Sequence, residues 1–182
     1  MDSNFKKLSI PDVILIQPKI LSDDRGFFYE NFKQSEFIKN GIPKFVQENY
    51  SHSKNNVIRG LHFQRNPKPQ AKLISVMNGK IFDVAVDLRK SSPTFGSWIS
   101  EILSDENHKS LYIPEGFAHG FCVLSNTADV IYKTNREFSA EFDSGIIWND
   151  PEINISWPIT NPILSEKDKK LPNLKNSKNN FS

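Results

Sequence analysis

The chain has 182 residues, 37% of them hydrophobic and 24% charged, which is typical of one globular domain with a buried core. Its 23 basic and 21 acidic residues leave a net charge of +2, so no whole-protein field attracts a nucleic-acid backbone. The lone cysteine, Cys122, cannot form an intramolecular disulfide, and neither a secretory signal nor a membrane-length apolar run is evident. We therefore expect a single domain over residues 1–182 that is cytoplasmic and binds neither nucleic acid nor membrane.

In chain order, the apolar stretches are short and separated by turn residues. They surround residues 13–16, 27–32, 57–61, 98–103, 121–124 and 130–132. The helical signal is limited to residues 35–40 and a turn after Ser165, and 11 prolines leave little room for long helices. Many short strands at regular spacing predict an all-β sandwich or β-barrel, the architecture of jelly rolls, with a few short helical turns.

A hairpin is predicted in the middle of the chain. Residues 82–88 alternate apolar and other side chains with a period of two, and residues 72–77 form another apolar run before them. Asn78-Gly79 separates the two runs, and Asn-Gly is the strongest short-range hairpin signal because both residues tolerate positive φ. The last stretch, residues 171–182, is rich in Lys, Asn and Ser, and it predicts a flexible tail.

Two histidines stand in segments that resemble the metal-binding motifs of cupins. Pro114-x-Gly-x-x-His119 resembles the second motif, and His62 falls where the first would be. A metal cupin usually supplies another histidine two positions on and then a carboxylate. Here position 64 is Gln, and no Asp or Glu occurs in the next dozen residues. Because a divalent metal requires neutral imidazoles and carboxylates, we predict that no metal binds here.

The same residues have a structural alternative. His62 and His119 could be hydrogen-bonded core histidines without a chemical role. Arg59, Gln64 and Lys72 occur with them, however. Burying so many donors is costly unless an anionic ligand or carboxylates accept their hydrogen bonds and balance their charge. By their spacing alone, Tyr132 and Asp168 remain compatible with a half-buried strand aromatic and a solvated acid.

Several motifs, in order over about residues 8–172, resemble one family, the dTDP-4-dehydrorhamnose 3,5-epimerases. They are RGLHFQ at 59–64, QAKL at 70–73, GKIFDVAVDLR at 79–89, SPTFGSW at 92–98, IPEGFAHGF at 113–121, YK at 132–133, WNDP at 148–151 and LSEKD at 164–168. The resemblance implies a cupin-type jelly roll, a homodimer with exchanged N-terminal strands, and no cofactor. It also implies that the substrate dTDP-4-dehydro-6-deoxy-D-glucose is converted to dTDP-4-dehydro-L-rhamnose, on the route to dTDP-L-rhamnose.

The resemblance further implies roles for individual residues. His62 would be the general base with Asp168 as its charge partner, Lys72 would lie near the C4 oxygen, and Tyr132 would donate a proton on the other face. The positions that hold the nucleotide or sugar would be Arg25, Glu30, Gln47, Asn49, Ser51, Arg59, Lys72, His119, Phe138, Asp143 and Lys167. Phe138 replaces a tyrosine that often stacks on thymine, and Asp143 replaces a glutamate. Neither departure involves the acid or the base.

Four other functions share parts of this pattern. An epimerase that inverts only C3 or only C5 would use the same His and Tyr. A 3,4-ketoisomerase of the same fold is disfavoured by the set His62, Lys72, Tyr132 and Asp168, and a metal-dependent cupin by the ligand pattern. A non-catalytic sugar-nucleotide binding module predicts the loss of one of those four residues, and all four are present.

Overall fold

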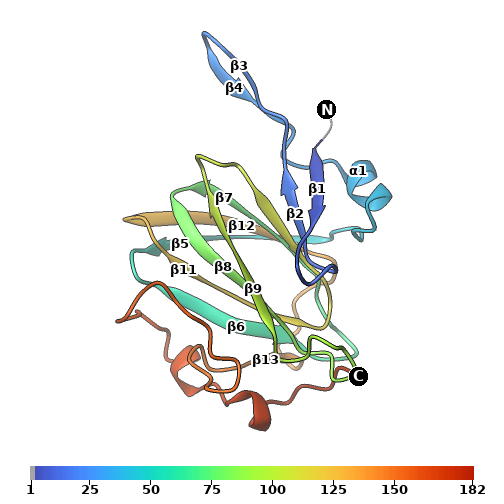
Figure 1. The fold of residues 1–182 in the computed structure, drawn as a ribbon, viewed down its shortest axis with the longest axis vertical. Coiled ribbons are helices and arrows are strands. Elements are labelled where there is room, and N and C mark those ends of the chain that lie inside the picture. Colours follow the sequence, from blue (N-terminus) through green and yellow to red (C-terminus); the bar gives the residue numbers. More distant parts are fainter. Residues whose placement is uncertain (1–2) are drawn as a thin grey trace.

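Two antiparallel sheets form the body of the computed structural model, which describes residues 3–182 (Figure 1). One sheet has six strands in the order β1-β2-β10-β7-β12-β5, and the other has five in the order β13-β6-β11-β8-β9. The strands of the first sheet are β1 (Asn4–Lys7), β2 (Ile14–Gln17), β5 (Gln47–Lys54), β7 (Lys72–Asn78), β10 (Ser110–Ile113) and β12 (Thr127–Thr134). Those of the second are β6 (Ile58–Gln64), β8 (Lys80–Asp87), β9 (Trp98–Ser104), β11 (Phe117–Val123) and β13 (Asp143–Gly145).

Most consecutive strands of the body lie in opposite sheets, as in a jelly roll. The all-β jelly roll expected from the sequence is therefore confirmed, although the two sheets face each other without closing into a continuous hydrogen-bonded barrel. The helical elements are as short as expected: α1 (Gln34–Lys39), η1 (Asp168–Lys170) and η2 (Leu174–Asn176). Within the described residues, no helix has the length and apolar character needed to cross a membrane.

The hairpin predicted around Asn78-Gly79 is wrong. The chain does reverse there, with Gly79 at φ 82°, but β7 pairs with β10 and β12 while β8 pairs with β11 and β9. The turn thus leads from one sheet to the other. Ile74 and Ile81 belong to the same core cluster between the sheets. Both strands bury apolar side chains on their inner faces, so facing across a sandwich satisfies the pattern as well as pairing would.

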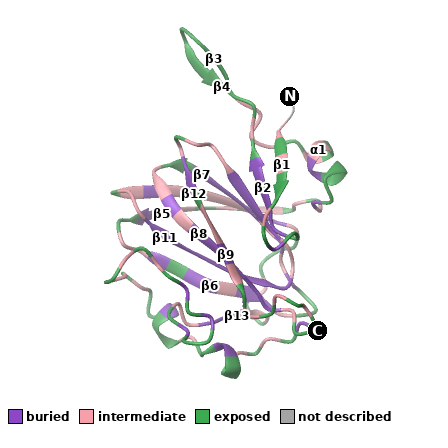
Figure 2. Ribbon diagram, in the orientation of Figure 1, coloured by how far each residue is buried: buried purple, intermediate pink, exposed green. Residues whose placement is uncertain are grey.

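The C-terminal stretch also differs from the predicted flexible tail. It packs along the outer face of the five-stranded sheet, where Leu174 and Phe181 are 8% and 6% exposed (Figure 2). The Phe181 ring lies 5.8 Å from that of Phe63, and Asn179 Nδ2 donates to the carbonyl of Leu88 at 2.6 Å. Two well-placed apolar residues are enough to anchor a segment whose composition is otherwise polar.

A two-stranded arm, β3 (Leu21–Asp23) paired with β4 (Gly26–Phe28), projects from the body (Figures 1 and 2). Its apolar side chains are unusually exposed, with Phe27 at 60% and Phe28 at 61%. Phe27 in β4 and Tyr29 just after it pack against His108 in the loop between β9 and β10. An arm this apolar and exposed has the character of a protein-binding surface.

Candidate active site

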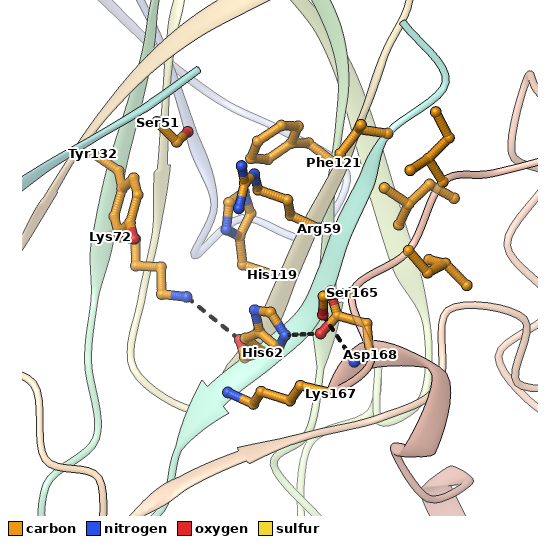
Figure 3. A pocket seen from close by; sticks show the side chains of 14 residues that line it. Ser51, Arg59, His62, Lys72, His119, Phe121, Tyr132, Ser165, Lys167 and Asp168 are labelled. Atoms are coloured by element: carbon orange, nitrogen blue, oxygen red, sulfur yellow. Dashed lines mark hydrogen bonds and ion pairs between the residues drawn. The ribbon is translucent and has the colours of Figure 1, made fainter. Parts of the chain in front are cut away.

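A cavity of about 520 Å³ lies between the two sheets (Figure 3). The six-stranded sheet contributes Ser51, Lys72 and Tyr132 to its wall, and the five-stranded sheet contributes Arg59, His62, His119 and Phe121. The segment before and within η1 closes one side with Ile163, Leu164, Ser165, Lys167 and Asp168. Hydrogen bonds from Ile58 N to Ile163 O and from Ile163 N to Asn56 O tie that segment to the start of β6. Residues 106 positions apart in the sequence are thereby brought into contact.

His62 and Asp168 form a close polar contact in this cavity. His62 Nε2 lies 2.6 Å from Asp168 Oδ1, and their side chains are 29% and 4% exposed. Burial alone would raise the pKa of Asp168, but the hydrogen bond and charge interaction with His62 and the contact with Ser165 hold the pKa below its ordinary value. The carboxylate therefore stays ionised beside the ring. The other ring nitrogen of His62 faces the cavity (Figure 3).

Lys72 and Tyr132 lie on the opposite wall from His62 (Figure 3). The Lys72 ammonium donates to the backbone carbonyl of His62 at 3.4 Å. Burial lowers the pKa of Lys72 to about 8, so the amine is still mostly charged at neutral pH. Burial raises the pKa of the Tyr132 hydroxyl, which therefore carries its proton at neutral pH.

A second histidine–aspartate pair lies deeper. His119 Nε2 is 2.7 Å from Asp83 Oδ1, and the two side chains are only 9% and 0% exposed. Among residues 3–182, only two buried side-chain polar atoms have no hydrogen-bond partner, and they are Asp83 Oδ2 and Ser51 Oγ. Ser51 lines the cavity, so its hydroxyl is available to a bound molecule.

An adjoining cavity of about 310 Å³ extends the site. It shares His62, Lys72, Tyr132 and Lys167 with the first and adds, among others, Gln47, Asn49, Gln64, Phe138 and Asp143. Gln47 accepts a hydrogen bond from the Phe138 amide at 2.8 Å, and Asp143 forms an ion pair with Lys167. The Phe138 ring is 57% exposed, which leaves its face available for stacking.

The structure brings together all of the predicted site residues except two. Arg25 lies in the turn of the β3–β4 arm, where its guanidinium pairs with Asp23, and Glu30 follows β4 by two residues. Neither residue lines either of the two cavities described above. Their distance in the fold follows from the arm, which leaves the body before the site-forming strands begin (Figure 1).

Sequence reasoning missed Asp83 and the apolar side of the cavity. Asp83 alternates with apolar residues on β8, a pattern that resembles an ordinary strand with a polar face. In the structure that face is the interior, where Asp83 lies between the core residues Ile81 and Ala85. The sequence of residues 82–88 did contain an indication, because Asp83 shares its strand face with the apolar Ala85 while the other face is apolar throughout. Val57, Ile163 and Leu164 also line the cavity. Ile163 and Leu164 could not be predicted to do so, because they reach the cavity only when the C-terminal segment folds back onto β6.

The donor groups of the site favour proton transfer. Within the described part of the chain, no three His, Cys, Asp or Glu side chains gather closely enough to hold a metal ion. Gln64, at the position where a metal cupin places its second histidine, donates to Lys68 O and accepts from the Ser139 amide. A buried lysine and a protonated tyrosine face, across the cavity, a histidine that is hydrogen-bonded to an ionised aspartate. The fold and the site together define a cupin-type enzyme suited to acid–base chemistry.

Comparison with known proteins specifies the family. A family model described as dTDP-4-dehydrorhamnose 3,5-epimerase matches residues 7–176. The dTDP-4-dehydrorhamnose 3,5-epimerase of Shigella flexneri is 53% identical over 167 residues, which cover 91% of this chain and 92% of that protein. The chain therefore belongs to the dTDP-4-dehydrorhamnose 3,5-epimerase family, and the resemblance seen in the sequence is confirmed.

Solved structures agree with this assignment. The dTDP-4-dehydrorhamnose 3,5-epimerase from Bacillus anthracis, with TDP and PPi bound, is similar at a TM-score of 0.92 and 49% identity, covering 94% of this chain and 99% of that one. The Legionella pneumophila enzyme in complex with dTDP-4-keto-L-rhamnose gives a TM-score of 0.92 at 45% identity, with coverage of 96% and 94%. These neighbours have the cupin-type jelly roll, so the expected fold family is confirmed as well.

Proposed function

We propose that this chain epimerises C3 and C5 of dTDP-4-dehydro-6-deoxy-D-glucose to give dTDP-4-dehydro-L-rhamnose, a step of dTDP-L-rhamnose biosynthesis. The observation that carries the proposal is the placement of His62 and Tyr132 on opposite walls of one cavity, with Lys72 beside them (Figure 3). Inversion of a carbon centre needs a proton to leave one face and return to the other, and this arrangement supplies a group for each face.

The chemistry explains why a lysine belongs in this cavity. The hydrogens at C3 and C5 are both adjacent to the C4 carbonyl, so removing either leaves an enolate with its charge on the C4 oxygen. A fixed cation next to that oxygen stabilises the transition state more than the ground state. We assign this role to Lys72, whose pKa of about 8 keeps the amine mostly charged at neutral pH.

We assign the base to His62. Asp168 accepts a hydrogen bond from Nε2–H, which fixes the tautomer and leaves Nδ1 free to take a proton. After the transfer, the same carboxylate stabilises the imidazolium. Tyr132, which holds its proton at neutral pH, is the acid that returns a proton to the other face. Such a positioned acid or base contributes about 10²–10⁴-fold each.

The remaining pockets suit a nucleotide. We propose that the adjoining cavity of Gln47, Asn49 and Phe138 receives the dTDP base, with Phe138 stacking on it and the two amides reading its polar edge. Arg59, Lys167 and His119, which line the first cavity, would hold the phosphates and sugar. The Arg59 Nε donates to Ser53 Oγ at 2.9 Å, which orients its guanidinium.

We also propose a homodimer in which the β3–β4 arm crosses to the other copy. The exposed Phe27 and Phe28 support this, because burial against a partner would remove them from water. Arg25 and Glu30 would then complete the partner's site, which accounts for two predicted binding residues lying outside their own. We expect the enzyme to work in the cytoplasm.

Proton NMR of dTDP-4-dehydro-6-deoxyglucose with the enzyme in heavy water tests the reaction. We expect the C3 and C5 proton signals both to disappear, also in the presence of a chelator. Loss of only one signal would replace the proposal by a single-centre epimerase. If neither position exchanges while dTDP binds, the assignment of the reaction is wrong.

A further inference from the structure

The Asp83–His119 pair is part of the site, but the reaction described above gives Asp83 no role. Asp83 lies in the middle of β8, on the face that points between the two sheets, and its side chain is 0% exposed. It does not line the cavity and lies behind His119, which does. Burying a carboxylate is costly unless its charge is used or fully answered.

Only one of the two carboxylate oxygens of Asp83 accepts a hydrogen bond from the described residues. Oδ1 accepts from His119 Nε2 at 2.7 Å, whereas Oδ2 has no hydrogen-bond partner in the described part of the chain. Burial lowers the pKa of His119, with the charge and hydrogen bond of Asp83 acting in the opposite direction, so the imidazole is neutral at neutral pH. Within residues 3–182, the negative charge of Asp83 therefore has no cation in direct contact, and it acts on a buried cation farther away.

Lys72 is that cation. Charged and titratable groups surround it from both sheets and from the C-terminal segment. They are Asp143 on β13, Asp83 on β8, Arg59 and His62 on β6, His119 on β11, Tyr132 on β12, Lys167 before η1 and Asp168 within it. Burial lowers the pKa of Lys72, Asp143 and Asp83 raise it, and Lys167 lowers it. Asp143 and Lys167 form an ion pair, so their effects on Lys72 oppose each other. Asp83 has no such opposing partner.

We propose that Asp83 is a positioning residue for the proposed epimerase reaction, and that its buried carboxylate keeps Lys72 charged and fixes the ring of His119 toward the cavity. The inference rests on the proposed function, because it explains how a buried amine remains a cation that can stabilise an enolate. Asp83 never touches the substrate. By accepting from Nε2–H it also sets the His119 tautomer, which leaves Nδ1 as an acceptor for a ligand hydroxyl.

The variant Asp83→Asn keeps the size of the side chain and removes its charge. The titration of Lys72 can be followed without substrate, by competitive labelling with acetic anhydride across about pH 6–10 and mass spectrometry of the peptide that contains Lys72. We expect a midpoint near pH 8 in the wild type. In the variant, we expect the midpoint to fall by on the order of one unit, and the alkaline limb of kcat/KM to move with it. An unchanged midpoint would overturn the inference.

Asp87→Asn is the matched control. Asp87 lies on the same strand and is also 0% exposed, but its charge is answered by Arg89. We expect the Lys72 midpoint to stay at its wild-type value in this variant, and an equal shift would overturn the inference by assigning the effect to a general change in the sheet. If Asp83→Asn fails to fold, Asp83→Ser removes the same charge with a smaller side chain and gives the same readout. Because labelling needs no substrate, an inactive wild type would count against the proposed reaction and not against this inference.

Discussion

The site contains two histidine–aspartate pairs of nearly equal length, 2.6 Å for His62–Asp168 and 2.7 Å for His119–Asp83, in different surroundings. The first pair joins β6 to the C-terminal segment, and its imidazole is 29% exposed to the cavity. The second joins two neighbouring strands inside the sandwich, and its members are 9% and 0% exposed. An imidazole that reaches a ligand and keeps an ionised partner can accept a proton. An imidazole that is buried beside a lysine stays neutral, and its aspartate partner keeps a negative charge near that lysine.

Among the variants that test this difference between the two pairs, we expect Tyr132→Phe to lose the most activity. If the His62 pair removes protons and Tyr132 only returns them, the variant should lose about 10³-fold in epimerised product. It should still exchange protons with heavy water, because the base on the other wall is intact. The measurement is product formation and deuterium incorporation in the same NMR time course. Equal loss of both would mean that Tyr132 also takes part in proton removal.

Asp168→Asn should have the next largest effect. An amide can offer its own N–H to Nε2, which stabilises the wrong tautomer of His62 and places the proton on the nitrogen that should act as base. We expect kcat to fall on the order of 10²-fold or more, with dTDP affinity close to that of the wild type. Steady-state kinetics and calorimetric titration with dTDP measure the two quantities. A variant with wild-type kcat would remove the distinction between the two pairs.

Asp87→Asn tests whether a buried carboxylate away from the site affects stability and not catalysis. Burial alone would raise the pKa of Asp87, but hydrogen bonds from Arg89, Ser92 and Thr94 lower it to about 2. A folded-state pKa below that of the unfolded chain stabilises the protein above the unfolded pKa, and this contribution is lost as the pH falls toward 2. We expect the variant to lose about 2 kcal/mol of unfolding free energy at neutral pH, and the difference from wild type to shrink below about pH 4.

Urea unfolding of the wild type and Asp87→Asn at several pH values checks this, with kcat as the control. Because Asp87 is answered by donors of its own loop, kcat should change little. A large loss of kcat with unchanged stability would mean that Asp87 serves the site, as we propose for Asp83.

Much of the site was predictable from the sequence because its residues lie in continuous motifs. His62 and Arg59 share one strand, and Lys72 and Tyr132 point inward from two others, so the strand pattern carries them into the same interior. The contact of Asp168 with His62 depends on a segment that returns from the end of the chain, and only the family resemblance could place it. Local pattern alone left it compatible with a solvated acid.

Other features were not predictable for physical reasons. Alternation on β8 identifies two faces, but whether the polar face meets water or a second sheet depends on long-range packing, so the burial of Asp83 was hidden. The Asn78-Gly79 turn fixes a reversal of the chain and not the partner of each strand. The burial of Phe181 depends on the shape of the sheet surface that receives it.

The central claim is that the His62–Asp168 pair performs the proton removal, and deuterium exchange by His62→Ala tests it most directly. The variant should be compared with the wild type at equal concentrations, with dTDP binding measured on both to show that the site is intact. We expect exchange at C3 and C5 to fall by at least about 10²-fold, with dTDP affinity within a few-fold of wild type. Exchange at a near wild-type rate in the variant would contradict the account, because some other group would then be the base.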